Sequence, residues 1–227
     1  MSNGNLIADR DFGMNVALGG LAQRGYAPDV VFDIGAADGQ WARTVLQTWP
    51  LCKVVCFEPL PQRQAALETL KGDYPGRVDV VACGVGDADT SLSIGVTDSL
   101  FDSSFAYGGK ASICVPVRRL DSLRSQGRIP GANFVKVDVQ GFEKRVIDGG
   151  VDLIRRADLV LLECQFLPFC ADMRTLDQTI GHMASLGFIP YEFVDLLRRP
   201  LDGAMGQCDI LFVRKGHPLV SDLRWSA

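Results

Sequence analysis

The sequence predicts an α/β fold in which helices cover both faces of a mostly parallel sheet. Short, almost continuously hydrophobic runs alternate with segments of helical spacing, and these runs are 30–34, 53–57, 78–82, 134–139 and 159–163. Such runs are typical of parallel strands buried on both faces, and their alternation with helices indicates right-handed βαβ units. Two later runs, 188–194 and 208–213, have no helical segment between them, so we expect them to pair antiparallel at the sheet edge.

Helical spacing is clearest after the first and the fifth of these runs. Trp41, Val45 and Trp49 recur one helical turn apart, and residues 176–184 repeat the pattern. Asp121 precedes a short polar segment and is expected to be an N-cap residue. The helices that follow the strands therefore complete the βαβ units.

Length and composition indicate one domain that spans residues 1–227. An N-terminal helical extension is expected over 1–27, and 91–119 is interpreted as an inserted strand, loop and strand. The chain is 47% hydrophobic and has neither a long apolar stretch nor a basic, apolar leader, so we expect a cytoplasmic protein without membrane insertion. The net charge of −4 argues against a nucleic-acid partner, and a homo-oligomer is compatible with the sequence.

The segment VFDIGAADGQ, residues 31–40, is the strongest indication of a cofactor site. A buried strand ends at Asp33, and Gly35 and Gly39 allow a sharp turn and a close approach of a ligand to the backbone. Asp38 would repel a pyrophosphate, whereas it tolerates a ligand with an ammonium and a sulfonium group. The turn therefore favours S-adenosylmethionine over a nicotinamide dinucleotide, and the expected binding residues are Asp33, Gly35, Ala36, Asp38, Gly39 and Gln40.

Residues after the next two strands extend this site. Glu58 ends the second strand, where an acid can accept hydrogen bonds from ribose hydroxyls, and Pro59 follows it. The adenine edge is expected beside Cys83 and Gly84, at the end of the third strand. The cofactor site is completed by Asp138 and by two serines of the inserted loop, Ser103 and Ser104.

These segments resemble the FkbM-type methyltransferases over about 30–214. The resemblance is carried by VFDIGAADGQ, VVCFEPLP, the Ser103-Ser104 pair, VPVRRLDSL, FVKVDVQGFEKRVIDGG, LLECQFLPF and CDILFVR. It implies a Rossmann-like class I methyltransferase fold, with a seven-stranded, mostly parallel sheet and an antiparallel last strand. It also implies methyl transfer from S-adenosylmethionine to a hydroxyl of a sugar, a glycosylated metabolite or a polyketide-type molecule. Ala37 and Cys170 depart from the family pattern, which often has asparagine and an aromatic residue there.

Catalysis is expected from acids at the ends of the fourth and fifth strands. An alkyl hydroxyl has a pKa near that of water, about 15.7, so it needs a base or a metal. Asp138 is the first candidate for general base and Glu163 the second, while Lys136 lies on the same strand face as Asp138. The alternative is a structural ion network of Lys136, Asp138 and Glu143. No metal site is predicted, since no third ligand joins the two acids.

Other functions remain open from the sequence. A small-molecule N-methyltransferase would need no strong base, and a catalytically silent nucleotide-binding domain could have the same fold. A nucleotide-dependent oxidoreductase is disfavoured by Asp38 and by the missing second glycine. The acceptor pocket is expected from 97–112, from 198–206 and from Gln165, Phe166, Pro168 and Phe169.

Overall fold

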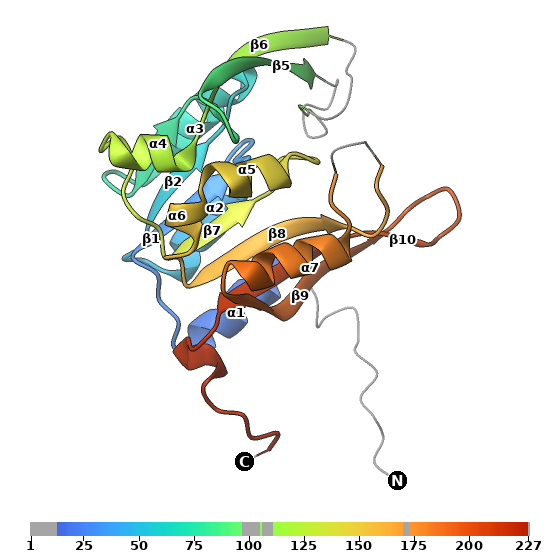
Figure 1. The fold of residues 1–227 in the computed structure, drawn as a ribbon. Coiled ribbons are helices and arrows are strands. Elements are labelled where there is room, and N and C mark those ends of the chain that lie inside the picture. The colour runs from blue at the N-terminus through green and yellow to red at the C-terminus, as the bar shows by residue number, and fades with distance from the viewer. Residues whose placement is uncertain (1–12, 97–104, 106–110, 170–172, 227) are drawn as a thin grey trace.

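The computed structural model describes residues 13–96, 105, 111–169 and 173–226. Its seven-stranded sheet has the order β3-β2-β1-β7-β8-β10-β9 (Figure 1). The bounds are β1 Val30–Ile34, β2 Lys53–Phe57, β3 Val78–Val81, β7 Phe134–Val137, β8 Leu159–Gln165, β9 Phe188–Arg198 and β10 Met205–Arg214. The strand order reverses beside β1, because β2 and β7 flank it in parallel. Ligands of open α/β sheets bind at this kind of reversal.

β10 runs antiparallel to both of its neighbours, β8 and β9. The predicted mostly parallel sheet with an antiparallel last strand is therefore confirmed. The predicted bounds of the first two strands agree with the structure, whereas β7 ends two residues earlier than 134–139 and β8 continues to Gln165. The longer β8 pairs with β10 as far as Gln207, a pairing that hydrophobicity alone does not indicate because both residues are polar.

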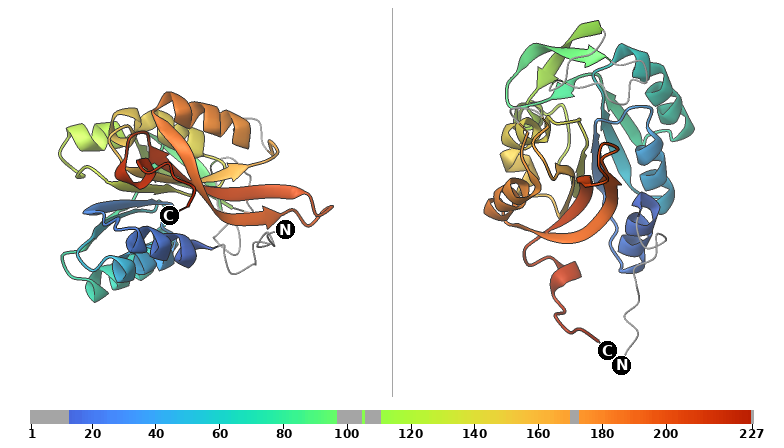
Figure 2. Two further views of the ribbon diagram at one scale, coloured as in Figure 1. Left: turned by 90° about the horizontal axis from the view of Figure 1, so that it is seen from below. Right: turned by 90° about the vertical axis from the view of Figure 1, so that its right-hand side faces the viewer.

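Helices cover both faces of the sheet, as the two views in Figure 2 show. One face packs against α1 Met14–Gln23, α2 Gln40–Thr48 and α3 Pro61–Asp73, and the other against α4 Leu120–Ser125, α5 Glu143–Gly149, α6 Val151–Ile154 and α7 Leu176–Ser185. Alternation along β1 explains the two layers, since Val31 packs with the first group of helices and Phe32 with the second. A short 3-10 helix, Pro218–Val220, follows β10.

A second sheet lies beside the carboxyl end of the first. It has three strands in the order β4-β6-β5, with bounds β4 Gly84–Val85, β5 Thr90–Val96 and β6 Ala111–Arg118. β5 and β6 pair antiparallel within the segment that was interpreted as an insertion. Small apolar contacts join this sheet to Leu60, so it forms a wall beside the tip of β2.

The expected N-cap role of Asp121 is wrong for its own helix. Arg119 is the N-cap of α4, and Asp121 lies in the first turn. Its carboxylate instead accepts hydrogen bonds from the backbone N–H groups of Asp152 and Leu153, at 3.2 and 3.0 Å, where α6 begins. Asp121 therefore links α4 to α6, which are neighbours in space but not in sequence. A local sequence pattern does not reveal such a contact.

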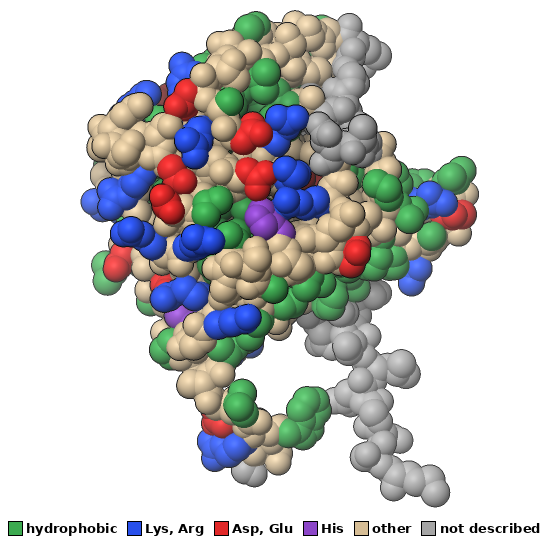
Figure 3. Space-filling model, in the orientation of Figure 1, with side chains coloured by type: hydrophobic (Ala, Val, Ile, Leu, Met, Phe, Trp, Pro, Cys, Tyr) green, Lys and Arg blue, Asp and Glu red, His purple; other side chains and the backbone are tan. Residues whose placement is uncertain are grey.

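Basic and acidic side chains are interspersed over the face that Figure 3 shows. Several form ion pairs, including Lys144 with Asp148 at 2.7 Å and Arg145 with Asp87 at 3.3 Å. Within the described chain, no helix is both long enough and apolar enough to cross a bilayer.

Candidate active site

The turn after β1 packs directly on the end of β7. Gly35 has a φ of 82°, and a Cβ atom there would lie 1.9 Å from the carbonyl oxygen of Asp138. Gly39 has a φ of 81°, and its Cβ atom would meet Leu70 of α3 at 2.7 Å. The sequence indicated a sharp turn and the close approach of a ligand at both glycines, and their positive φ values agree with the turn. In the structure, contacts within the protein already require them, through their left-handed backbone and the lack of space.

Glu58 ties the tip of β2 to this turn. Its Oε2 accepts a hydrogen bond from the backbone N–H of Ala37, and its Oε1 accepts one from Leu60, both at 2.9 Å. Burial raises the pKa of Glu58, and the two N–H groups counteract this effect. The carboxylate also lines the main pocket of the site, where its remaining lone pairs can accept further hydrogen bonds.

The pocket lies over the carboxyl ends of β1, β2 and β7. Of the expected cofactor residues, it is lined by Gly35, Glu58, Pro59, Cys83, Gly84 and Asp138. Phe105 belongs to the segment 97–112 that is expected at the acceptor pocket, and Ala37 is the residue of the cofactor turn that departs from the family pattern. The sequence did not single out the remaining lining residues, which are Ile34, Phe57, Leu60, Arg63, Val85, Ile94, Val139 and Gln140. Val85, Ile94 and Phe105 give one end an apolar surface suited to a flat heteroaromatic ring. The opposite end, at Asp138, is polar.

Other expected cofactor residues do not line this pocket. They are Asp33, Ala36, Asp38, Gly39 and Gln40. Asp38 contacts Gln40 at 3.1 Å and lies 4.0 Å from the guanidinium of Arg63. Ser103 and Ser104 lie outside the described residues. The turn after β1 therefore lies at the pocket, but several of its residues do not line the pocket wall.

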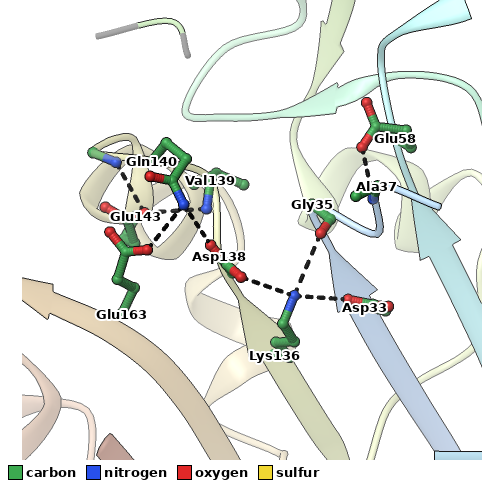
Figure 4. Close-up of polar contacts among 11 residues, drawn as sticks. Asp33, Gly35, Ala37, Glu58, Lys136, Asp138, Val139, Gln140, Glu143 and Glu163 are labelled. Atoms are coloured by element: carbon green, nitrogen blue, oxygen red, sulfur yellow. Dashed lines mark hydrogen bonds and ion pairs between the residues drawn. The ribbon is translucent and has the colours of Figure 1, made fainter. Parts of the chain in front are cut away.

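Lys136 links the acids of β1 and β7 (Figure 4). Its Nζ lies 3.1 Å from Asp33 Oδ1, 3.3 Å from Asp138 Oδ2 and 3.4 Å from the carbonyl oxygen of Gly35. Burial opposes its charge, but Asp33 and Asp138 outweigh burial and raise the pKa of Lys136. An ammonium group has three protons, and each has an acceptor here. This arrangement favours a positioning role for Lys136 over a direct contact with an acceptor.

Glu163 and Asp138 differ strongly in exposure. The side chain of Asp138 is 40% exposed, whereas Glu163 is only 6% exposed. Glu163 accepts hydrogen bonds from Gln140 at 3.0 Å and from Gln165 at 2.6 Å. Burial, followed by the charges of nearby acids, raises the pKa of Glu163 to about 9. The raised pKa favours the protonated form of Glu163, while Asp138 lines the pocket.

Two further acids surround this pair. Glu143 begins α5, as expected for a helix N-terminal acid, and burial raises its pKa to about 7. Asp209 of β10 lies opposite Glu163 in the strand register, and its pKa is also raised by burial to about 7. The sequence analysis missed Asp209. Its signal was a single acid within the apolar run of the last strand, which identifies a site only once the strand register is known.

We expect the protein to be more stable near pH 6 than near pH 8.5. The pKa values of Glu163, about 9, and of Glu143 and Asp209, about 7, lie above their ordinary values, so the folded state binds protons that the unfolded chain releases. Stability from such groups is complete below the unfolded-state pKa of about 4 and is lost as the pH rises through the folded-state values. Glu163→Gln should reduce the loss of Tm between these two pH values, measured by thermal unfolding. An equal loss of Tm in parent and variant would contradict this expectation.

Solved methyltransferases share the fold of this chain. The methyltransferase FkbM of Methylobacillus flagellatus KT superposes with a TM-score of 0.53 at 16% identity, over 80% of this chain and 43% of that one. This chain thus spans less than half of that solved structure. The magnesium protoporphyrin IX methyltransferase of Synechocystis PCC 6803, solved with bound SAM, gives 0.52 at 10% identity, over 87% and 76%.

Residues 33–190 match the methyltransferase FkbM domain. The chain belongs to this family and is an S-adenosylmethionine-dependent methyltransferase. It is 29% identical to the 2-O-methyltransferase NoeI of Sinorhizobium fredii over 78% of each chain. It is 25% identical to the hexuronic acid methyltransferase AglP of Haloferax volcanii, over 63% of this chain and 59% of that one. The family and enzyme class indicated by the sequence are confirmed.

Proposed function

We propose that this enzyme methylates a hydroxyl of a sugar, a glycosylated metabolite or a polyketide-type small molecule. The observation that carries the proposal is a half-exposed carboxylate, Asp138, held by two donors at the polar end of the pocket. The names of two relatives support it, since one is a 2-O-methyltransferase and the other acts on a hexuronic acid.

The residues of the pocket fit S-adenosylmethionine. The apolar surface of Val85, Ile94 and Phe105 suits the adenine ring, and the carboxylate of Glu58 suits the ribose hydroxyls. Gly35 and Ala37 of the turn after β1 also line the pocket. When bound, the cofactor supplies a methyl group already activated by its sulfonium, so the protein has to align the acceptor and remove its proton.

Asp138 is the residue we assign as general base. Its carboxylate lines the pocket, and Lys136 contacts one of its oxygens at 3.3 Å. The acceptor hydroxyl donates its proton to the Asp138 carboxylate as the oxygen gains nucleophilic character. Glu163 is buried and does not line the pocket, and its raised pKa favours the protonated form, so we assign it a role in supporting Asp138.

An amine acceptor is the second candidate. A neutral amine is nucleophilic without a base, so N-methylation needs no carboxylate held in this manner. The ion network of Asp33, Lys136 and Asp138 is therefore better explained by a hydroxyl acceptor. Screening amines beside sugars and polyketide alcohols, with methylated products detected by mass spectrometry, separates the two functions.

The cofactor assignment is tested by calorimetric titration with S-adenosylhomocysteine, with NAD as control. Micromolar binding of the former and none of the latter is the expected result. Binding of NAD instead would contradict our interpretation of the turn at Gly35. A folded protein that binds neither would favour a silent domain.

Glu58→Ala should weaken binding of S-adenosylhomocysteine by about 1–3 kcal/mol, because a buried hydrogen-bond acceptor is lost. Glu58→Gln is the matched variant, since it keeps the size of the side chain and one acceptor oxygen, and it should lose less. Thermal unfolding shows whether the backbone N–H groups of Ala37 and Leu60 tolerate the change. An unchanged affinity in Glu58→Ala would remove this residue from the cofactor site.

A further inference from the structure

Gln140 lies three residues after the carboxyl end of β7 and has a strained backbone conformation. Its φ is 54°, a left-handed value that residues other than glycine, asparagine and aspartate rarely adopt, and Gly141 follows with a φ of 94°. Oε1 of Glu143 accepts hydrogen bonds from the backbone N–H groups of Val139 and Gly141, at 3.1 and 3.0 Å. The turn is thereby fixed, with glutamine at a position where glycine would relieve the strain.

The side-chain amide of Gln140 lies between two carboxyl groups (Figure 4). Its Nε2 donates one hydrogen bond to Asp138 Oδ1 and one to Glu163 Oε2, each at 3.0 Å. Both N–H donors of the amide are thus used within the site. The amide spans the ends of β7 and β8 and stands between groups that would repel each other if both were ionised.

Among the residues that the structure describes, Lys136 is the cation in contact with Asp138. The charged or titratable groups of the described residues that face it are Lys136 on its own strand, Asp33 on β1, Glu143 on α5, Glu163 on β8 and Asp209 on β10. Lys136 binds Oδ2 and Gln140 binds Oδ1. These two donors from opposite sides fix the plane of the carboxylate that faces the pocket.

We propose that Gln140 is a positioning residue, whose amide holds Asp138 and Glu163 in one arrangement and keeps Asp138 directed into the pocket. This inference rests on the proposed role of Asp138 as general base. The left-handed backbone of Gln140 places its amide between Asp138 and Glu163. A relaxed backbone at this residue would direct the side chain elsewhere, which explains why the strain is retained.

Gln140→Gly separates positioning from structure. Glycine relieves the left-handed strain, so the Tm should equal or exceed that of the parent. Methyl transfer should nevertheless slow by about tenfold or more, because the base loses its alignment. The affinity for S-adenosylhomocysteine should stay within about threefold. The acid limb of the pH–rate profile should move to higher pH, since the two carboxyls lose a shared donor.

Gln140→Met and Gln126→Met are the companion variants. The first keeps the length of the side chain without its donors and should repeat the kinetic result if the glycine variant folds poorly. The second makes the same replacement at an exposed glutamine that ends α4 and does not line the pocket. It should leave the acid limb where the parent has it.

A titration of Glu163 that needs no acceptor substrate completes the test. In protein labelled with ¹³C at the glutamate carboxyls, the Glu163 signal is assigned with Glu163→Gln, and its titration is followed in the parent and in Gln140→Gly. We expect the pKa of Glu163 to rise in Gln140→Gly, since its charged form loses a donor. An unmoved titration and an unmoved acid limb would overturn the positioning role. A parent that binds cofactor but methylates no hydroxyl would instead refute the proposed function, so the two failures are distinguishable.

Discussion

Asp138→Asn is expected to slow methyl transfer by about 100-fold or more, because the variant loses the rate enhancement that a general base provides. Asparagine has nearly the same size, and its amide oxygen can still accept the hydrogen bond from Lys136. Lys136 also keeps Asp33, at 3.1 Å, as its counter-ion. Folding and binding of S-adenosylhomocysteine should therefore be preserved, within about threefold in affinity. Single-turnover methyl transfer and calorimetry measure the two properties separately.

Asp79→Asn is the matched control for this variant. Asp79 is an exposed acid on β3 and does not line the pocket, so its amide variant should be as active as the parent. If Asp138→Asn were active within a few-fold of the parent, Asp138 would not be the general base and its role would be structural. In that case Glu163→Gln would become the next variant to test.

The sequence was a good guide to the sheet because each buried strand has its own pattern. The runs at β1 and β2 have apolar residues on both faces, and an acid lies near the end of each, since Asp33 is the penultimate residue of β1 and Glu58 directly follows β2. Strand ends in a parallel sheet meet at one edge, so these acids could be assigned to one site from sequence alone. Their exact partners could not, because they depend on neighbouring strands.

Asp33 shows this limit most clearly. It lies beside Lys136 in the register of β1 and β7 and is fully buried, so its carboxylate holds an ion network instead of lining the pocket. Asp209 was missed for the same reason, since its position opposite Glu163 follows from the pairing of β10 with β8. Arg63 comes from a helix with no strand-end pattern, and only the packed structure brings it to the pocket.

The second large effect is expected for Gly35→Ala. A Cβ atom would lie 1.9 Å from the carbonyl oxygen of Asp138 and 2.9 Å from its carbonyl carbon. Both atoms belong to the backbone at the end of β7, so no flexible side chain can move aside. The φ of 82° adds the penalty of a left-handed conformation. We expect a loss of about 3 kcal/mol in the free energy of unfolding, and no measurable binding of S-adenosylhomocysteine.

Gly72→Ala is the matched control, since Gly72 lies in α3 with no atom within 4 Å of its added Cβ. Alanine there should stabilise the helix by up to about 1 kcal/mol. Gly39→Ala is the intermediate case, because its Cβ would meet the side chain of Leu70, which can shift. The expected order of unfolding free energies is therefore Gly72→Ala, then Gly39→Ala, then Gly35→Ala. If Gly35→Ala kept the parent's Tm and affinity, the turn after β1 would have to yield, and Asp138 would not be fixed by this contact.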